Sequence, residues 1–350
     1  MTPTPKRFSL WDAFSISRPL DRRFINPPPM NTTKLPWSPP TVPLMLAPMQ
    51  GLTNRALRRV FIDWVRPDVV FTEFIRVSPA QRRPPVSDVD ETEALDGAGE
   101  APVVVQIIAA DHDRMVDAAR RLDERGVQHI NINMGCPYGR MTGQLSGGGM
   151  LKAPEHLDEL LLRLREVVGG SLSVKTRAGF DDEEQVFTLV EAFEAAAVDF
   201  LVIHPRTVVE KFDGHADHEI TARLVAATTI PVIANGDIAT AAQAHQVLEE
   251  TGAAGLMLGR GALGDPMLFE RIRGRASPKP SSSERADEIR YFLPRLVEGY
   301  QHLYCGDAQV LSKLKGSLAY FDVPDINRWL TALRRAQKLS VFAELALRGP

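Results

Sequence analysis

The chain has 350 residues, a formal net charge of −3, and 44% hydrophobic and 24% charged residues. These ordinary values exclude a wholly disordered chain, a collagen-like chain and a small disulfide framework. No stretch approaches the roughly 20 apolar residues that span a bilayer, so we expect no membrane partner. Asp12 and Arg18 interrupt any apolar run behind Lys6 and Arg7, so we expect no secretion signal, and Cys136 and Cys305 lie far apart. This predicts reduced thiols and a cytoplasmic protein.

The first 40 residues differ from the rest in composition. They hold nine of the 26 prolines and carry six basic residues against two acidic ones. Such a segment buries little apolar surface, so we predict a flexible, basic extension over residues 1–40.

From residue 41 onward, short β-rich apolar runs alternate with amphipathic helical patterns such as Ala110–Arg125 and Glu155–Val168. Strands that alternate with helices indicate right-handed βαβ units and a parallel sheet. Eight units predict an α/β protein with a closed (β/α)8 barrel over residues 41–274. The expected strands are Val42–Leu46, Val69–Glu73, Val103–Ile107, His129–Asn133, Leu172–Thr176, Phe200–His204, Pro231–Asn235 and Gly255–Leu258.

A second region follows the predicted barrel. Residues 275–284 are rich in proline and serine, which predicts a linker. Residues 285–350 have helical patterns throughout, so we expect a C-terminal α-helical bundle, in which Pro324 separates two helices and Cys305 is packed. The four expected helices lie around Ile289–Leu303, Val310–Tyr320, Ile326–Leu339 and Val341–Leu347.

The strand ends carry the functional signal, because catalytic groups of such barrels lie where the strands end at their C-terminal face. All eight expected strands end in polar or glycine-rich residues, which a purely structural barrel does not need. In chain order the ends are Ala47–Gly51, Thr72–Phe74, Gln106, Asn133–Pro137, Lys175–Arg177, His204–Arg206, Asn235–Asp237 and Gly259–Gly261.

Two of these turns predict a phosphate site. Asn235–Asp237 and Gly259–Gly261 pass from strand to helix through glycine, which permits close approach of a ligand. The loops after strands seven and eight form the commonest phosphate site of such barrels, and Arg260 adds a charged donor.

Three further strand-end residues suit a flavin. Lys175 needs an anion to stay charged in a largely apolar strand, and a reduced flavin supplies one. Gln106 can hydrogen-bond the edge of the ring, and His204 the flavin or its phosphate. For each residue taken alone, a satisfied buried polar group is the competing interpretation.

Cys136 stands between Gly135 and Pro137, which indicates a shaped loop at the barrel mouth. A free thiol is mostly protonated near neutral pH and can therefore donate a proton. No zinc-ligand spacing surrounds the cysteine, so we expect no metal. The glycine-rich residues 143–149 predict a mobile loop that closes over substrate.

Taken together, eight segments from about Leu46 onward resemble the tRNA-dihydrouridine synthases. The segment INMGCP is the most specific; its loop is similar to the B-type subfamily, whereas TEFIRV is similar to the C-type. The segments are LAPMQGLTN, TEF, VVVQI, INMGCP, VKTRAG, IHPRT, IPVIANGDI and LMLGRGA.

The resemblance implies FMN at the barrel mouth and NADPH as the reductant. A uridine of tRNA, in the D-loop, would be reduced at its C5–C6 double bond to 5,6-dihydrouridine, with Cys136 as the proton donor. The flavin would touch Pro48, Met49, Gln50, Gln106 and Lys175, and its polar tail and phosphate would be held by His204, Asn235, Gly236, Asp237, Gly259 and Arg260.

The resemblance also implies that tRNA docks on the helical bundle of a protein that we expect to be a monomer. Residues 313–348 carry seven basic against three acidic side chains. Arg140 stands close to where many family members have a lysine. The expected tRNA contacts are Asn133, Arg140, Arg177, Arg206, Lys313, Lys315, Arg334 and Arg335.

Two other functions compete with this one. An FMN-dependent oxidoreductase of a small pyrimidine, similar to dihydroorotate or dihydropyrimidine dehydrogenases, would share the phosphate turns but would not need the basic bundle. A barrel that binds RNA without a flavin is the second, and the presence of Lys175 and Cys136 argues against it.

Overall fold

The computed structural model describes residues 34–80, 82–96 and 101–350, except for the side chains of residues 140 and 141. Most of the predicted extension, residues 1–33, lies outside the described residues. Residues 34–40 are described, and they do not behave as a separate arm. Trp37 is buried, and its ring meets that of Phe200 edge-on, with 5.2 Å between centroids. The described end of the predicted extension is therefore part of the barrel's core.

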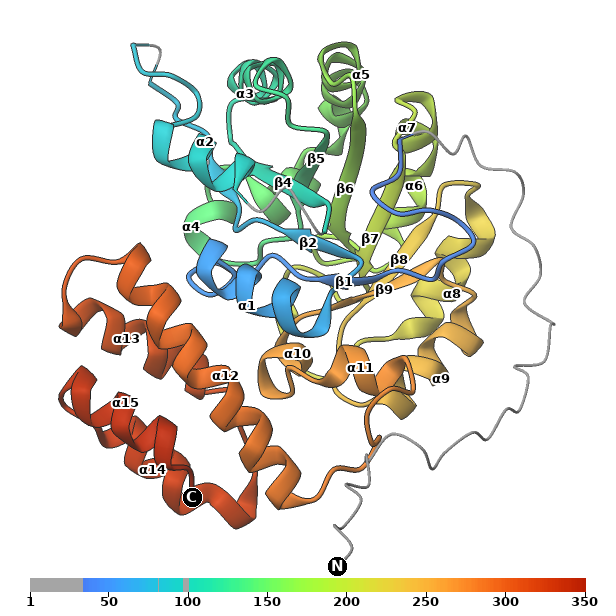
Figure 1. Cartoon of the computed structure of the whole chain (residues 1–350). Coiled ribbons are helices and arrows are strands. Elements are labelled where there is room, and N and C mark those ends of the chain that lie inside the picture. The colour runs from blue at the N-terminus through green and yellow to red at the C-terminus, as the bar shows by residue number, and fades with distance from the viewer. Residues whose placement is uncertain (1–33, 81, 97–100) are drawn as a thin grey trace, which may run out of the picture. The chain divides into compact units, whose positions relative to one another are not determined.

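Eight parallel strands close into a barrel, which confirms the predicted fold (Figure 1). The ring closes because β1 pairs with both β2 and β9, and β2 pairs with β4. A short extra strand, β3 (Ile75–Arg76), pairs with the end of β4. The eight strands of the ring are β1 (Leu44–Leu46), β2 (Val69–Phe71), β4 (Val103–Ile108), β5 (His129–Met134), β6 (Ser171–Arg177), β7 (Phe200–His204), β8 (Val232–Asn235) and β9 (Gly255–Leu258).

Amphipathic helices surround the strands, as the sequence pattern predicts. Some of these helices start at a side chain that accepts a backbone N–H group, such as Asp111 at α3 and the Thr240–Gln243 capping box at α9. The helices of this region are α1 (Arg55–Val65), α2 (Asp88–Leu95), α3 (His112–Glu124), α4 (Gly139–Thr142), α5 (Leu157–Val167), α6 (Gln185–Thr188), α7 (Val190–Ala195), α8 (His218–Ala227), α9 (Ala241–Thr251), α10 (Arg260–Gly264) and α11 (Leu268–Ile272), with the 3-10 turns η1 (Gly147–Lys152) and η2 (Pro154–His156).

The alternation of side chains along the strands positions the site. In β5, Ile130 and Ile132 pack outward with the surrounding helices, so Asn131 and Asn133 point into the barrel. In β7, Phe200 and Val202 join the apolar interior, and the same face brings His204 to the mouth. The barrel interior is thus apolar toward the N-terminal ends of the strands and polar toward their C-terminal ends.

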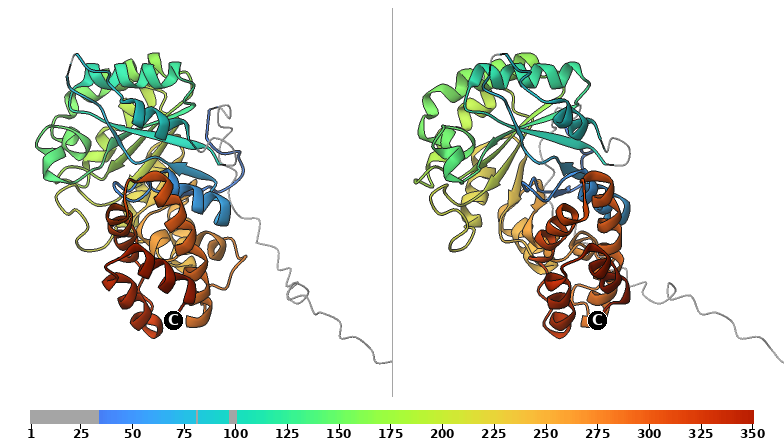
Figure 2. Two further views of the ribbon diagram at one scale, coloured as in Figure 1. Left: turned by 60° about the vertical axis from the view of Figure 1, so that its left-hand side comes forward. Right: turned by 90° about the vertical axis from the view of Figure 1, so that its left-hand side faces the viewer.

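The C-terminal region is helical, as predicted, and consists of α12 (Ser282–Leu303), α13 (Asp307–Leu318), the 3-10 turn η3 (Pro324–Ile326), α14 (Asn327–Arg335) and α15 (Leu339–Arg348). Figure 2 shows these orange to red helices beside α1. Helix α12 begins within the stretch predicted as a linker, because Ser281 and Glu284 form a capping box. The prediction that Cys305 is packed was wrong. It lies exposed in the turn between α12 and α13, where no helix face buries it.

Candidate active site

A cavity of about 990 Å³ opens at the C-terminal ends of the strands. Its volume is at the upper end of the range typical of sites for small molecules and cofactors. All the residues that the sequence analysis assigned to the cofactor line this cavity, and so do Cys136, Asn133 and Arg177. The cofactor set is Pro48, Met49, Gln50, Gln106, Lys175, His204, Asn235, Gly236, Asp237, Gly259 and Arg260.

The loop that carries Cys136 is held by the strand before it. The side-chain oxygen of Asn133 accepts the backbone N–H groups of Gly135, at 3.1 Å, and of Cys136, at 3.0 Å. Arg177 donates from Nε to the carbonyl oxygen of Gly135, at 2.9 Å. The cysteine is therefore buried but stays at the cavity wall.

Burial raises the pKa of the Cys136 thiol above its usual value. The backbone N–H of Tyr138 and the positive charge of Arg177 favour the thiolate, but they offset only part of this effect. The thiol is thus protonated at neutral pH, which suits a proton donor and not a nucleophile.

The segment behind Cys136 differs from its prediction. Gly147, Gly148 and Gly149 form part of the buried turn η1, and Gly148 donates to the carbonyl oxygen of Cys136 at 3.0 Å. A Cβ at Gly147 would lie 2.8 Å from that of Cys136. Here glycine permits close packing, so the prediction of a mobile loop over the substrate was wrong for this part of residues 143–149.

Lys175 is a cation without a carboxylate partner among the residues that the structure describes. Its Nζ donates to Oδ1 of Asn235 at 3.0 Å, and Nδ2 of Asn235 donates to the carbonyl oxygen of Met257. Burial, helped by the charge of Arg177, lowers the pKa of Lys175 to about 7. An anionic ligand would restore the charged form.

His204 and Asp237 are joined through Arg206. Arg206 donates to Nε2 of His204 at 3.0 Å and to Oδ2 of Asp237 at 2.6 Å. Since an arginine only donates, the proton of His204 is on Nδ1. Burial and the nearby cations lower the pKa of His204, so the ring is neutral.

Asp237 also pairs with Arg260 at 3.2 Å and accepts the N–H of Ala216. Burial alone would raise the pKa of this carboxyl, but the bonds from Arg206 and Ala216 hold it below its usual value. Its carboxylate thus orients two arginines, and a bound phosphate would meet Arg260. At Gly236, whose φ is 125°, a Cβ would collide with Ala216.

Two arginines predicted to contact tRNA, Arg206 and Arg177, are buried and bound to groups within the protein. Arg206 is buried, and it also donates to the carbonyl oxygens of Asp213 and Gly214. This geometry favours a positioning role over an RNA contact. Arg177 is buried as well and donates to the carbonyl oxygens of Thr207 and Lys211.

None of the four predicted contacts of the helical region lines the cavity, but Nζ of Lys313 lies 4.0 Å from where a Cβ of Gly51 would stand, beside the lining residues Gln50 and Leu52. Arg334 donates to the carbonyl oxygens of Leu318 and Phe321, so it caps α13. Nζ of Lys313 lies 5.4 Å from the centre of the Tyr304 ring. Lys315 is half-buried and Arg335 is exposed. The side chain of Arg140 lies outside the described residues.

Sequence reasoning missed the aromatic residues of the cavity mouth. The guanidinium carbons of Arg177 and Arg260 lie 5.3 Å and 4.9 Å from the centre of the Phe212 ring, and Phe212 is 41% exposed. Tyr138, two residues after the cysteine, is 63% exposed. Both stand in irregular segments, where no hydrophobic period singles them out.

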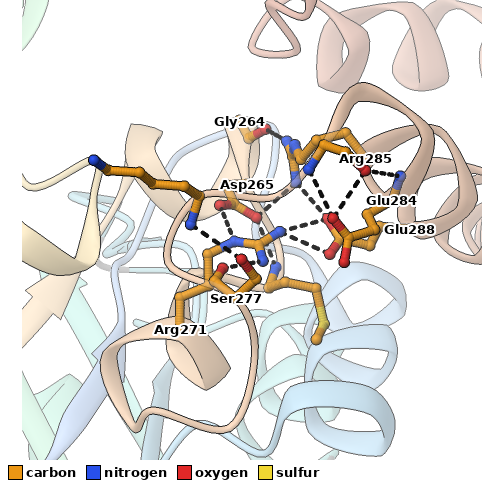
Figure 3. A network of polar contacts seen from close by, with 10 residues as sticks. Gly264, Asp265, Arg271, Ser277, Glu284, Arg285 and Glu288 are labelled. Carbon is orange, nitrogen blue, oxygen red and sulfur yellow. Dashed lines mark hydrogen bonds and ion pairs between the residues drawn. The ribbon is translucent and has the colours of Figure 1, made fainter. Parts of the chain in front are cut away.

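The helical region reaches the cavity through a network of charged groups (Figure 3). Asp265, in the segment after α10, accepts from Arg271 of α11 and from Arg285 of α12, each at 2.7 Å. Both arginines also bind Glu288 of α12. Asp265 and Arg285 line the cavity, so this network fixes the start of α12 at its edge.

In the part of the chain that the structure describes, no helix is long and apolar enough to cross a membrane. The same residues contain no cluster of three or more His, Cys, Asp or Glu side chains that could hold a metal ion.

Solved structures with a similar fold include morphinone reductase, with a TM-score of 0.51 and 16% identity. It matches 75% of this chain and 94% of its own. TcOYE has a TM-score of 0.52 and 12% identity, over 79% of this chain and 99% of its own. At such identities the likeness concerns the fold alone.

Sequence comparisons are more specific. A probable tRNA-dihydrouridine synthase of Rhodobacter capsulatus is 36% identical over 74% of this chain and 81% of its own. The tRNA-dihydrouridine synthase B of Vibrio cholerae is 33% identical over 73% of this chain and 80% of its own. The family model described as dihydrouridine synthase matches residues 45–336. The chain therefore belongs to the dihydrouridine synthase family of oxidoreductases.

Proposed function

We propose that this protein reduces the C5–C6 double bond of a uridine in the D-loop of tRNA, using FMN held at the barrel mouth and NADPH as the reductant. In the same proposal, the protein is a monomer and is located in the cytoplasm. The observation that carries it is the meeting in one cavity of the protonated Cys136, the turns of Gly236 and Gly259, and Lys175, which has no carboxylate partner among the described residues.

The residues present fit an anionic, planar cofactor. Lys175 has no carboxylate partner among the described residues, so a ligand with negative charge would stabilise its ammonium form. Arg260 offers a guanidinium at the glycine turns, where a phosphate would lie. Gln106 and the neutral His204 offer hydrogen bonds to a polar ring or tail. FMN, when bound there, supplies a hydride for C6 of the uracil ring.

The chain's own contribution to the reaction is the proton. Cys136 keeps its proton at neutral pH because burial disfavours the thiolate. Transfer of this proton to C5 of the uracil avoids an uncompensated negative charge on the ring, and general acid catalysis of this kind contributes about 10²–10⁴-fold.

The uracil reaches the cavity only if it is turned out of the folded tRNA, which costs a few kcal/mol of stacking. The exposed rings of Tyr138 and Phe212 line the cavity, and stacking of bases on them would offset part of this cost. Exposed cations such as Arg335 would contact the phosphate backbone.

The direct test is to map dihydrouridine in tRNA from cells with and without this protein. We expect at least one position to lose the modification when the protein is absent. If every dihydrouridine persists, and the purified protein with FMN and NADPH does not modify tRNA that lacks dihydrouridine, the proposal is wrong.

The role of Cys136 is tested with Cys136→Ala and, as a matched control, Cys305→Ala. We expect Cys136→Ala to bind FMN and accept electrons from NADPH normally, but to reduce uridine about 10²-fold more slowly or worse. Cys305 is exposed and does not line the cavity, so its variant should match the parent. Equal turnover by both variants would remove Cys136 from the reaction.

A further inference from the structure

A chain of hydrogen bonds runs inside the barrel from β6 to the Cys136 loop. Oγ of Ser173 accepts from Nδ2 of Asn131 at 2.9 Å, and Oδ1 of Asn131 accepts from Nε2 of Gln106 at 2.8 Å. Oε1 of Gln106 accepts from Nδ2 of Asn133 at 2.8 Å, and Asn133 in turn holds the N–H of Cys136. All four side chains are buried.

The direction of every bond in this chain follows from its two ends. The N–H groups of Gly135 and Cys136 can only donate, so Asn133 must present its oxygen to them and its nitrogen to Gln106. The same reasoning orients Gln106 and then Asn131. At the other end, the hydroxyl of Ser173 donates to the carbonyl oxygen of Ile130 and is therefore free to accept.

The direction of these hydrogen bonds also determines which group of Asn133 faces a ligand in the cavity. Both acceptor positions of the Asn133 oxygen are taken by backbone N–H groups, so its remaining hydrogen-bonding group toward a ligand is an N–H. If the chain were broken at Ser173, Asn131 could turn over, and Gln106 and Asn133 would lose the partners that hold their orientation.

We propose that Ser173 and Asn131 are positioning residues, which fix the Cys136 loop and the ligand-facing N–H of Asn133 through this chain. The inference rests on the proposed function of Cys136 as proton donor. Neither residue touches the loop itself, and neither lines the cavity. Their effect on the reaction would therefore pass through Gln106 and Asn133.

The test compares Ser173→Ala with a matched control on the same pair of strands. Ser171 lies two residues earlier on β6 and binds Nδ1 of His129 on β5 at 2.8 Å, just as Ser173 binds Asn131. Both serines are fully buried. Ser171→Ala therefore removes an equivalent buried hydrogen bond without touching the chain that leads to Cys136.

Because a displacement of about 1 Å can cost 10²-fold in rate, we expect Ser173→Ala to lower kcat for uridine reduction about tenfold or more. The KM for tRNA should stay close to that of the parent, and the reduction of bound flavin by NADPH, which depends on the chain only through Gln106, should slow less than uridine reduction. In the flavin-free protein, carrying Cys305→Ala, iodoacetamide should alkylate Cys136 several-fold faster. Ser171→Ala should change neither kcat nor alkylation.

Ser173→Thr keeps the hydroxyl and should restore both readouts, whereas a packing effect would leave it impaired. Should Ser173→Ala fail to fold, Asn131→Ala breaks the chain one link closer to the cysteine and is judged by the same measurements. Equal behaviour of the Ser173 and Ser171 variants overturns the inference. A parent protein that makes no dihydrouridine would instead refute the proposed function, and the alkylation comparison would still decide the inference.

Discussion

At the scale of single residues, Lys175 makes the stability of the barrel mouth depend on pH. Its pKa is lowered to about 7 by burial, against about 10.4 in an unfolded chain. Between these two pKa values the folded protein binds fewer protons than the unfolded one, so the stability of the ligand-free protein rises with pH across this window. At pH values below about 7, Lys175 is protonated in both states, and the folded state then bears the whole free-energy cost of burying the ammonium group.

This linkage predicts a pH dependence of cofactor binding. An anionic ligand stabilises the ammonium form, so above about pH 7 its binding takes up a proton and the affinity for FMN falls as the pH rises. Lys175→Met, which cannot titrate, should bind FMN more weakly and lose this slope. Titration of the flavin-free protein with FMN between about pH 6 and 9 checks this. Identical slopes for parent and variant would contradict it.

Arg206 shows that residue type alone does not reveal a role. In the sequence it is a cation at a strand end, which suits RNA, but its fold neighbours are His204, Asp237 and two carbonyl oxygens. Removing one partner from such a buried network costs about 3–5 kcal/mol, because the remaining groups stay buried and unpaired. Arg206 therefore orients His204 and Asp237, while burial is the main cause that keeps His204 neutral.

At the scale of elements, the turn η1 forms the wall behind the Cys136 loop. A Cβ at Gly148 would lie 2.6 Å from Cγ2 of Val208 and 2.9 Å from the carbonyl oxygen of Cys136. Real Cβ atoms do not approach backbone so closely, so either the turn or the cysteine loop must move. The contact thus transmits any change in η1 to Cys136, the proposed proton donor.

We therefore expect Gly148→Ala to destabilise the protein by about 1–3 kcal/mol, as overpacking does, and to slow uridine reduction more than flavin reduction. Gly139→Ala is the matched control, since a Cβ at the exposed Gly139 meets nothing within 4 Å. Thermal denaturation and single-turnover kinetics of both half-reactions measure the two effects. If Gly148→Ala behaves like Gly139→Ala, the close packing has no role.

The elements divide clearly by how well sequence predicts them. Strands such as Phe200–His204 are buried on both faces and bounded by turn residues, so their apolar runs alone locate them. The polar strand ends were also predictable, because a closed barrel brings all eight together. The structure of the loops was not predictable in this way. The glycine residues of η1 predict a flexible segment from the sequence, and only the packing of η1 on Cys136 shows that it is a buried turn.

At the scale of the whole molecule, the described residues from Lys34 onward belong to one compact unit. One apolar cluster joins the barrel helices to the C-terminal helices. Its aromatic centre links Phe269 of α11 to Phe61 of α1, and Phe61 to Phe292 of α12, with ring centroids about 6 Å apart. The helical region thus shares the barrel's core, and the short stretch before α12 does not separate them energetically.

A shared core predicts a single cooperative unfolding transition. Phe292→Ala should lower the free energy of unfolding by about 3–5 kcal/mol, because its ring is buried against both regions. Its neighbour Tyr291 is 39% exposed, so Tyr291→Ala should cost only about 1 kcal/mol, from its contact with Trp64. Hydrogen exchange of β5 and of α13 should then accelerate together in Phe292→Ala. Faster exchange confined to α13 would show that the two regions unfold independently.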